Sequence, residues 1–257
     1  MTSCPCVKPD APWIPSPEDR ATFPYWSDPI QGSENSCTII AAFVALAAWS
    51  DAFDPMRWIQ PETETETQLP EANIKLSNES GITVQLVVNS LWNVGDSTTR
   101  SCSKWVTVLE RALMNLWKWT GGMEETYDAP IQGDIDGTLF PLVLLTGWTS
   151  AHTDLTMDPT GPAILWGAPE RKGKALGEHA YGVIKTEVDH FVVRDARSHP
   201  KLPGGWEWCT PGGDVTDSDQ SFGVMRVPRS VNTGSDGTAS GRWTLGWAIP
   251  NENDSAV

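Results

Sequence analysis

Ile30-Gln31-Gly32-Ser33-Glu34-Asn35-Ser36-Cys37 is the stretch around which this chain of 257 residues is organised, together with the apolar run 38–49 that follows it. The run is rich in Ala and Ile and lacks Gly and Pro, which favours a helix. It is apolar on nearly every face, which predicts a buried helix. Cys37 would then lie at the helix N-terminus, where unpaired N–H groups and the helix dipole favour a thiolate.

Gln31 lies six residues before Cys37. Its side-chain N–H would stabilise negative charge beside the sulfur, and a thiolate with an adjacent donor is the start of a covalent acyl-transfer site. The alternative is that Cys37 is an inert buried thiol, as cysteines on apolar helices commonly are. The choice between these two interpretations depends on the rest of the chain.

The composition excludes several classes of function. A formal charge of −15 argues against nucleic-acid binding, which needs a basic face, and against an anionic membrane surface. Residues 1–10 have no apolar core, so we expect no secretory signal. The cysteines are few, odd in number and scattered, which favours a reducing, cytoplasmic setting. Cys4-Pro5-Cys6 has no second Cys/His pair nearby, so we expect no metal site and no other cofactor.

The patterning predicts an α+β protein with two lobes sharing one site. We expect an extended Pro-rich arm over 1–24, a mainly helical lobe over 25–150, and a mainly β lobe over 151–257. Within the helical lobe, 54–80 has the composition of an exposed acidic loop, and Ser103 begins a clear amphipathic helix that reaches Trp119. Residues 82–92 fit either a helix or a strand. The short β-rich runs of the second lobe are 163–166, 180–185, 190–194, 222–227 and 242–249.

Two of these runs place a histidine and an aspartate close together. His179 starts one run and Asp195 ends the next, and a short turn over 187–189 joins them as a β-hairpin. An aspartate on one ring nitrogen would fix the tautomer of His179 and leave the other nitrogen for a thiolate. His179 follows Cys37 by 142 residues, within the spacing of about 130–150 found in papain-like cysteine proteases.

Each of these residues also has an ordinary structural interpretation. His179 fits a strand-end histidine that bonds backbone groups. Asp195 fits a turn acid or an ion-pair partner of Arg194 or Arg197. Cys37, His179 and Asp195 together weaken these alternatives, because one nucleophile, one base and one orienting acid are the parts of a catalytic triad.

The motifs resemble the calpain protease core. Residues 31–37 keep the Gln, Gly and Cys of that family's Gln-Gly-x-x-Gly-Asp-Cys loop, and 105–112 is similar to its Trp-x-x-Leu-Leu-Glu-Lys-Ala helix. Residues 145–148 resemble its Thr/Ser-Gly-Gly segment, 178–183 its Gly-His-Ala-Tyr-Ser-Val strand, and 194–198 its Arg-Asn-Pro-Trp-Gly turn. The resemblance implies a papain-like fold, with a helical lobe packed against an antiparallel β-sheet lobe.

The chain departs from that family at several positions. Asp195 replaces the triad asparagine, and the Pro-Trp-Gly that follows it is missing, so Trp206 or Trp208 would have to supply the shielding tryptophan. Asn35-Ser36 stands in place of Gly-Asp before the cysteine. No EF-hand loop is present in the sequence, and calcium control stays open.

These residues predict a cysteine peptidase that acts through a thioester. Cys37 is the expected nucleophile, His179 the base, and Asp195 the residue that orients it, while Gln31 and the Cys37 N–H form the oxyanion hole. The expected substrate is a peptide or an acyl-thioester. The same triad serves an acyltransferase, an amide-forming ligase or a cyclase, and the sequence leaves the acceptor and the oligomeric state open. The further alternative is a non-catalytic binding module, against which the intact Gln31, Cys37 and His179 argue.

Overall fold

A computed structural model of the chain describes residues 14, 25–31, 36–50, 52–61, 71–77, 83–89, 103–119, 135–153, 155–167, 170–171, 174–175, 179–197, 206–209, 223–232 and 243–250. The helices are η1 (Tyr25–Ser27), α2 (Cys37–Trp49), η2 (Pro55–Arg57), α3 (Lys104–Trp119), α4 (Ile135–Thr146) and η3 (Arg229–Asn232). The strands are β1 (Ile59–Pro61), β2 (Glu71–Ser77), β3 (Thr83–Asn89), β4 (Thr149–Thr153), β5 (Ala163–Gly167), β6 (Glu170–Arg171), β7 (Lys174–Ala175), β8 (His179–Thr186), β9 (His190–Arg194), β10 (Glu207–Trp208), β11 (Val224–Pro228) and β12 (Trp243–Ile249).

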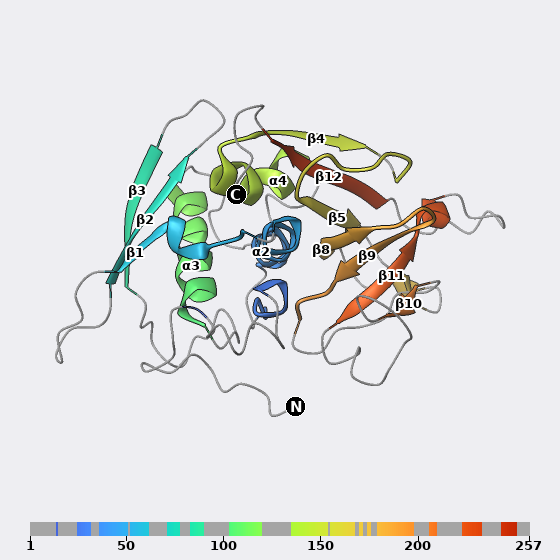
Figure 1. The fold of residues 1–257 in the computed structure, drawn as a ribbon, viewed down its shortest axis with the longest axis horizontal. Helices are drawn as coiled ribbons and strands as arrows, with labels where there is room; N and C mark the ends of the chain where they lie inside the picture. Colours follow the sequence, from blue (N-terminus) through green and yellow to red (C-terminus); the bar gives the residue numbers. More distant parts are fainter. Residues whose placement is uncertain are drawn as a thin grey trace.

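The described strands form one large sheet and two small ones. The large sheet has seven antiparallel strands in the order β10-β11-β9-β8-β5-β12-β4. A three-stranded sheet has the order β1-β2-β3, and β6 pairs with β7. The large sheet and the three-stranded sheet lie at opposite ends of the molecule, with α2, α3 and α4 between them (Figure 1). This arrangement is α+β, as the patterning predicted.

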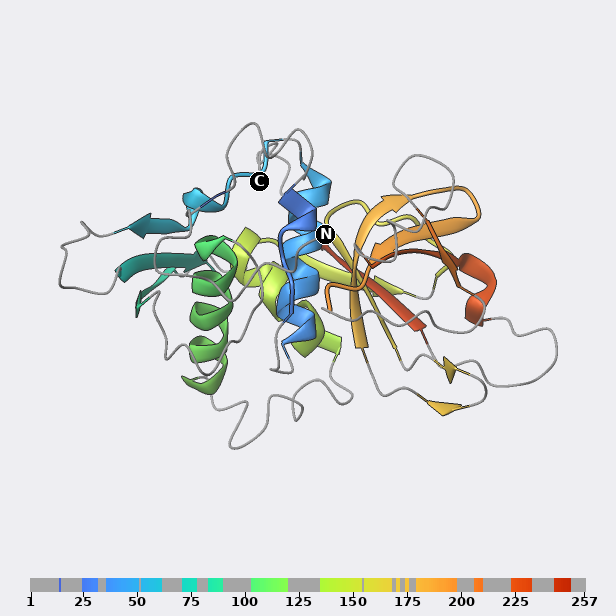
Figure 2. The ribbon, with the colours of Figure 1, turned by 90° about the horizontal axis from the view of Figure 1, so that it is seen from below.

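Helix α2 lies at the centre of the molecule. It begins at Cys37, as predicted, and all of residues 38–47 are buried. Figure 2 shows α2 between α3 and the large sheet, and α4 also packs against α2. A helix enclosed on all sides needs apolar residues on every face, which explains why this run has no polar stripe.

Strands β8 and β9 form the predicted hairpin. Gly182 pairs with Arg194, and the turn closes with a hydrogen bond of 2.8 Å from the Glu187 N–H to the His190 carbonyl. A β-bulge lies between Val183 and Lys185. The hairpin brings the end of β9 back beside the start of β8, where His179 lies.

The prediction of an exposed acidic loop over 54–80 is wrong in part. The polypeptide forms β1 before the acidic stretch and β2 after it, and the two strands pair with Ile59 opposite Ile74. The residues 71–77 alternate apolar and polar side chains, which is the period of a strand, but the surrounding prolines and acids suggested a loop. Residues 62–70, like the 1–24 arm except residue 14, lie outside the described residues.

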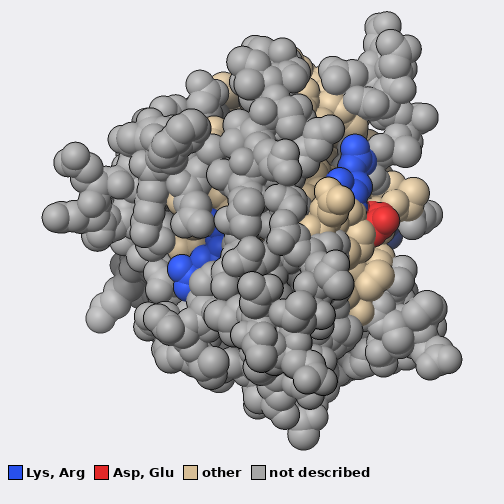
Figure 3. All heavy atoms as spheres, turned by 90° about the vertical axis from the view of Figure 1, so that its left-hand side faces the viewer, with Lys and Arg blue, Asp and Glu red and all other residues tan. Residues whose placement is uncertain are grey.

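The ambiguous stretch 82–92 contains a strand, β3, which pairs with β2. The predicted helix after Ser103 is confirmed as α3. No helix in the described part of the chain is both long and apolar enough to cross a membrane. On the face shown in Figure 3, described basic side chains reach the surface toward both sides, and acidic atoms lie beside the basic ones on the right.

Gly182 lies where α2 approaches the large sheet closely. A Cβ atom at this position would lie 2.5 Å from the Cβ and Cγ1 atoms of Val44 and 2.7 Å from the Ala41 carbonyl oxygen. The Val44 Cβ atom and the Ala41 carbonyl oxygen cannot move aside unless the helix itself moves. Gly182 therefore sets the distance between the helix that begins at Cys37 and the strand that begins at His179.

We expect Gly182→Ala to lower the free energy of unfolding by about 1–3 kcal/mol, the usual cost of overpacking a core. The substitution should also slow alkylation of Cys37, because α2 must move away from β8. Gly246→Ala is the matched control, since the three atoms nearest to a Cβ atom there belong to the Trp166 and Leu139 side chains and not to the backbone. Urea unfolding and iodoacetamide alkylation measure the two effects. Unchanged stability of Gly182→Ala would contradict the close approach.

Candidate active site

Cys37 is the first residue of α2, and its side chain is half-buried. Ser36 occupies the N-cap position, but its hydroxyl makes no capping hydrogen bond. It donates instead to the carboxylate of Glu110, which lies fully buried on α3. A serine at this position ordinarily accepts a hydrogen bond from a first-turn N–H group. Here those N–H groups are left for other acceptors close to the sulfur.

His179 is the first residue of β8 and is buried. Its Nε2 atom lies 3.0 Å from the Oδ1 atom of Asp195, which follows directly after β9. Because Nε2 is engaged by the carboxylate, Nδ1 is the nitrogen that remains for the sulfur of Cys37. The structure therefore brings together Cys37, His179 and Asp195, which are far apart in the sequence.

The electrostatics of this group favour a charged pair of thiolate and imidazolium. Burial opposes a thiolate at Cys37. A hydrogen bond and charge attraction from His179 act against burial, and the N–H groups of Ala180 and Thr38 add further hydrogen bonds. Together they outweigh burial, so the pKa of the thiol is lowered. Burial also opposes a charged His179, but the Asp195 carboxylate and then Cys37 outweigh it and raise the pKa of the imidazole to about 9. At neutral pH both shifts favour the ionised forms.

Asp195 contacts a second cation besides His179. The guanidinium of Arg197 donates from Nε to Oδ1 at 3.0 Å and from Nη2 to Oδ2 at 2.6 Å, and the Arg197 backbone N–H reaches Oδ1 at 3.1 Å. Burial raises the pKa of the Asp195 carboxyl, but His179 and Arg197 together hold it well below its usual range. The two interpretations of Asp195 are therefore compatible, because it contacts the histidine and forms an ion pair with Arg197 at once.

An aromatic cluster supports the histidine from the side. The ring of Tyr181 lies edge-on to His179 at 90°, with ring centroids 4.8 Å apart. Trp206 packs against Tyr181 at 4.9 Å, and Trp243 packs against Trp206 at 4.7 Å. Tyr181 is thus the ring that contacts His179, and Trp206, one of the two expected tryptophans, stands behind it. Trp208 is partly buried against the same core.

Gln31 is held against the segment that carries Asp195. Its backbone N–H donates to the Ala196 carbonyl at 2.8 Å, and Gln31 forms a parallel bridge with Arg197. The residue is buried, with 8% of its surface exposed. One short segment therefore supports both the residue beside His179 and the expected oxyanion donor.

Sequence reasoning assigned no role at this site to Tyr181 or Glu110, and it considered Arg197 only as an ion-pair partner of Asp195. Tyr181 and Arg197 each lie two positions from a predicted residue, and alternation along an extended chain was the available signal for them. The contact between Ser36 and Glu110 spans 74 residues, and no local pattern predicts it.

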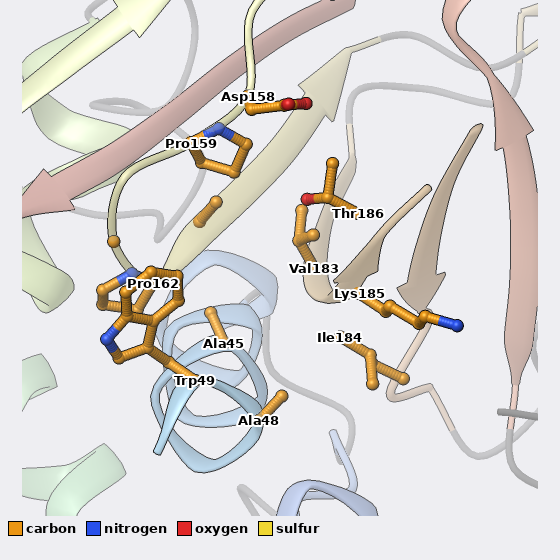
Figure 4. A pocket seen from close by; sticks show the side chains of 12 residues that line it. Ala45, Ala48, Trp49, Asp158, Pro159, Pro162, Val183, Ile184, Lys185 and Thr186 are labelled. Carbon is orange, nitrogen blue, oxygen red and sulfur yellow. The ribbon is translucent and has the colours of Figure 1, made fainter. Parts of the chain in front are cut away.

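A cavity of about 320 Å³ lies away from this group (Figure 4). Ala45, Ala48 and Trp49 of α2 line it, together with the 158–163 segment and residues 183–186 of β8. At 1.5 Å per residue, the α2 residues that line the cavity lie roughly 12 Å (Ala45) to 18 Å (Trp49) along the helix from Cys37. The cavity is therefore not part of the predicted site.

Within the described ranges, no three His, Cys, Asp or Glu side chains lie close enough to share a metal ion. The Cys4-Pro5-Cys6 stretch lies outside those ranges. Neither a protein-family model nor a curated protein matches the sequence.

Proposed function

We propose that this chain is a cysteine-dependent acyl-transfer enzyme, a peptidase, with a papain-like arrangement of the calpain type. Cys37 is the nucleophile, His179 is the general base and then the general acid, and Asp195 orients His179. The Gln31 side-chain amide and the Cys37 backbone N–H stabilise the oxyanion. The substrate is a peptide or another acyl donor that forms a thioester on Cys37.

The contact series Asp195–His179–Cys37 carries the proposal. A buried carboxylate 3.0 Å from His179 raises the imidazole pKa to about 9, and His179 in turn lowers the thiol pKa of Cys37. Acyl-transfer cysteines need a lowered pKa of this kind, because the thiolate is the nucleophile. An inert structural thiol in a core has its pKa raised instead.

The acylation step uses both members of the charged pair. The Cys37 thiolate attacks the carbonyl carbon, a bond forms between Sγ and that carbon, and the electron pair of the carbonyl moves to its oxygen. When the intermediate collapses, the C–N bond breaks and the imidazolium of His179 gives its proton to the leaving amine. The products are a thioester on Cys37, a free amine and a neutral His179.

Deacylation reverses the roles. Neutral His179 takes a proton from water, and the resulting hydroxide equivalent attacks the thioester carbon. The bond between Sγ and carbon breaks, the carboxylic acid leaves, and the thiolate–imidazolium pair is restored. An amine or carbon nucleophile in place of water would give an acyltransferase, a ligase or a cyclase with the same residues.

The architecture supports the papain-like part of the proposal. The nucleophile begins a central buried helix, and the histidine and aspartate lie on a hairpin of an antiparallel sheet. The motifs that resemble the calpain core contribute residues at these same places. Asp195, where that family has asparagine, is the main departure.

Alkylation and acyl trapping test the proposal. We expect iodoacetamide at about pH 6 to modify Cys37 quickly and selectively, because only an activated thiolate reacts at that pH. Cys209 is a built-in comparison, since it is a buried thiol with 1% of its surface exposed. Incubation with p-nitrophenyl acetate should leave an acetyl group on Cys37 that mass spectrometry detects.

The acyl acceptor is then decided by product analysis. Cleavage of denatured casein that needs Cys37 would support the peptidase. An acyl-enzyme that is released by added amines but not by water would favour an acyltransferase or ligase. A Cys37 that reacts with neither reagent would indicate a binding module and would overturn the proposal.

The negative charge of Asp195 leads to a prediction about the pH dependence of kcat/KM. The charged pair is lost above the pKa of the His179 imidazolium, so the alkaline limb of the kcat/KM profile should fall near pH 9 in the natural chain. We expect Asp195→Asn to retain activity but to move this limb down by about 1 pH unit or more, because an opposite charge is removed beside the imidazolium.

The ion pair of Asp195 with Arg197 supplies a matched control. Asp195→Asn alone leaves the Arg197 guanidinium beside the histidine, which disfavours the imidazolium further. The double variant Asp195→Asn/Arg197→Gln removes both charges, so its alkaline limb should lie between those of the natural chain and the single variant. Identical profiles for all three proteins would show that Asp195 does not act on His179.

A further inference from the structure

The segment 25–31, which ends at Gln31, lies between α3 and the large sheet and beside α2 (Figure 2). We name it the Gln31 segment. On the helical side, the Trp105 indole N–H donates to the Asp28 carboxylate at 2.5 Å. Within the segment, the Asp28 N–H donates to the Tyr25 carbonyl at 3.1 Å. Four further hydrogen bonds join the segment to Arg194 and Ala196, at the end of β9 and just after it.

A single buried arginine makes three of those bonds. Arg194 ends β9, and 4% of its surface is exposed. Its Nη1 atom donates to the carbonyls of Trp26 at 2.6 Å and Pro29 at 2.7 Å, and Nη2 donates to the carbonyl of Ser27 at 2.8 Å. A guanidinium presents its donors in a rigid plane, so three carbonyls bound to it are fixed relative to one another.

The charge of this arginine is kept in the folded protein. Burial disfavours the guanidinium, and Asp28 and Asp195 offset only part of that effect, so the pKa of Arg194 falls to about 10. Arg194 therefore remains charged at neutral pH. Buried backbone carbonyls need donors, and without Arg194 those of Trp26, Ser27 and Pro29 would each lose one.

The next contact along the segment is at Gln31 itself. Two residues after Arg194, the Ala196 carbonyl accepts the Gln31 N–H at 2.8 Å. Arg194 and Ala196 thus hold the backbone on both sides of Ile30, and they belong to the same stretch that carries Asp195. An oxyanion donor must be placed within about 0.5 Å of its working position, which a short loop cannot do unaided.

We propose that Arg194 is a positioning residue that holds the Gln31 segment so that the Gln31 amide stabilises the oxyanion. The inference rests on the proposed acyl-transfer function and adds a residue to it. In this role Arg194 acts through Gln31, whereas the thiolate–imidazolium pair depends on His179 and Asp195. This separation distinguishes the role from general structural support.

Two reagents separate these roles. Acylation by p-nitrophenyl acetate passes through a tetrahedral oxyanion, whereas alkylation by iodoacetamide is a displacement at a CH₂ carbon and develops no such oxyanion. We expect Arg194→Met and Gln31→Ala each to slow acylation by roughly 10- to 1,000-fold, the scale of one lost oxyanion donor. The KM should change little, because the donor acts mainly in the transition state. Alkylation of Cys37 should keep its natural rate.

Two further variants complete the test. In the Gln31→Ala background, Arg194→Met should cause no further loss of acylation, because both changes remove the same interaction. Arg194→Lys keeps the positive charge but not the planar fork, so it should slow acylation less than Arg194→Met and leave the pH profile of alkylation unmoved. Arg229→Met is the matched control. It removes a half-buried arginine that also donates to a backbone carbonyl, that of Glu187 at 2.9 Å, and should leave both rates unchanged.

Different outcomes would contradict the role of Arg194 and the proposed function. Additive losses in the double variant, or alkylation that falls together with acylation, would overturn the role of Arg194. If Arg194→Met does not fold, Arg194→Lys decides, and natural acylation by that variant would overturn the role as well. A natural protein that reacts with neither reagent would overturn the proposed function itself, which is a different result from a reactive protein that tolerates Arg194→Met.

Discussion

Cys37→Ala is expected to abolish acyl transfer while leaving the fold intact. In the proposed mechanism the thiolate at the start of α2 forms the covalent bond to the substrate, and no other described side chain at the site is proposed to replace it. Loss of the nucleophile from a catalytic unit costs on the order of 10⁴- to 10⁶-fold in kcat. Alanine is a good helix former, so α2 should be kept. Turnover of p-nitrophenyl acetate and far-UV circular dichroism measure the two parts of this prediction.

Cys209→Ala is the control for Cys37→Ala. Cys209 is buried beside Val192 and Val224 in a small cluster of the large sheet, and the proposed reaction does not use it. We expect this variant to keep its activity and to lose some stability from the missing sulfur. If Cys37→Ala retains more than about a tenth of the natural activity, Cys37 is not the nucleophile.

His179→Ala is expected to be about as damaging as Cys37→Ala, because a positioned nucleophile and its base act as a unit. The variant has a second expected effect on the thiol itself. His179 is the main group that lowers the pKa of Cys37 against the effect of burial, so its removal should raise that pKa. The rate of iodoacetamide alkylation should then rise only at higher pH than in the natural protein.

The matched control is His152→Ala, which removes an exposed histidine of β4. It should leave both the activity and the alkylation profile unchanged. The double variant Cys37→Ala/His179→Ala should be no worse than either single variant. A double variant that is much worse than both would mean that the two residues act independently, contrary to the proposed pair.

The parts of this fold that the sequence predicted are those with a strong local pattern. The unbroken apolar run made a buried α2 predictable, and the runs on either side of residues 187–189 made the β8–β9 hairpin predictable. The hairpin also predicted the contact between His179 and Asp195, because antiparallel pairing fixes which ends meet.

The parts that were not predicted depend on contacts between distant segments or on a pattern hidden by its neighbours. Strand β2 alternates correctly but lies beside a Pro- and acid-rich stretch that dominated the interpretation. Arg194 and Arg197 were candidates only as ion-pair partners of Asp195. In the structure Arg197 pairs with Asp195, and Arg194 binds three backbone carbonyls instead. This difference depends on where the distant segment around Trp26 lies, and no local periodicity predicts that position.

The position of α2 also has a consequence for how the molecule melts. This helix packs against α3, α4, β5 and β8, so these elements cannot separate from it without exposing residues 38–47 to water. The two halves should therefore lose their structure in one cooperative transition. Calorimetry should give a van 't Hoff enthalpy equal to the calorimetric enthalpy. Reactivity of Cys37 should disappear over the same temperature range as the helical signal, since the reactive group and the shared core belong to one helix.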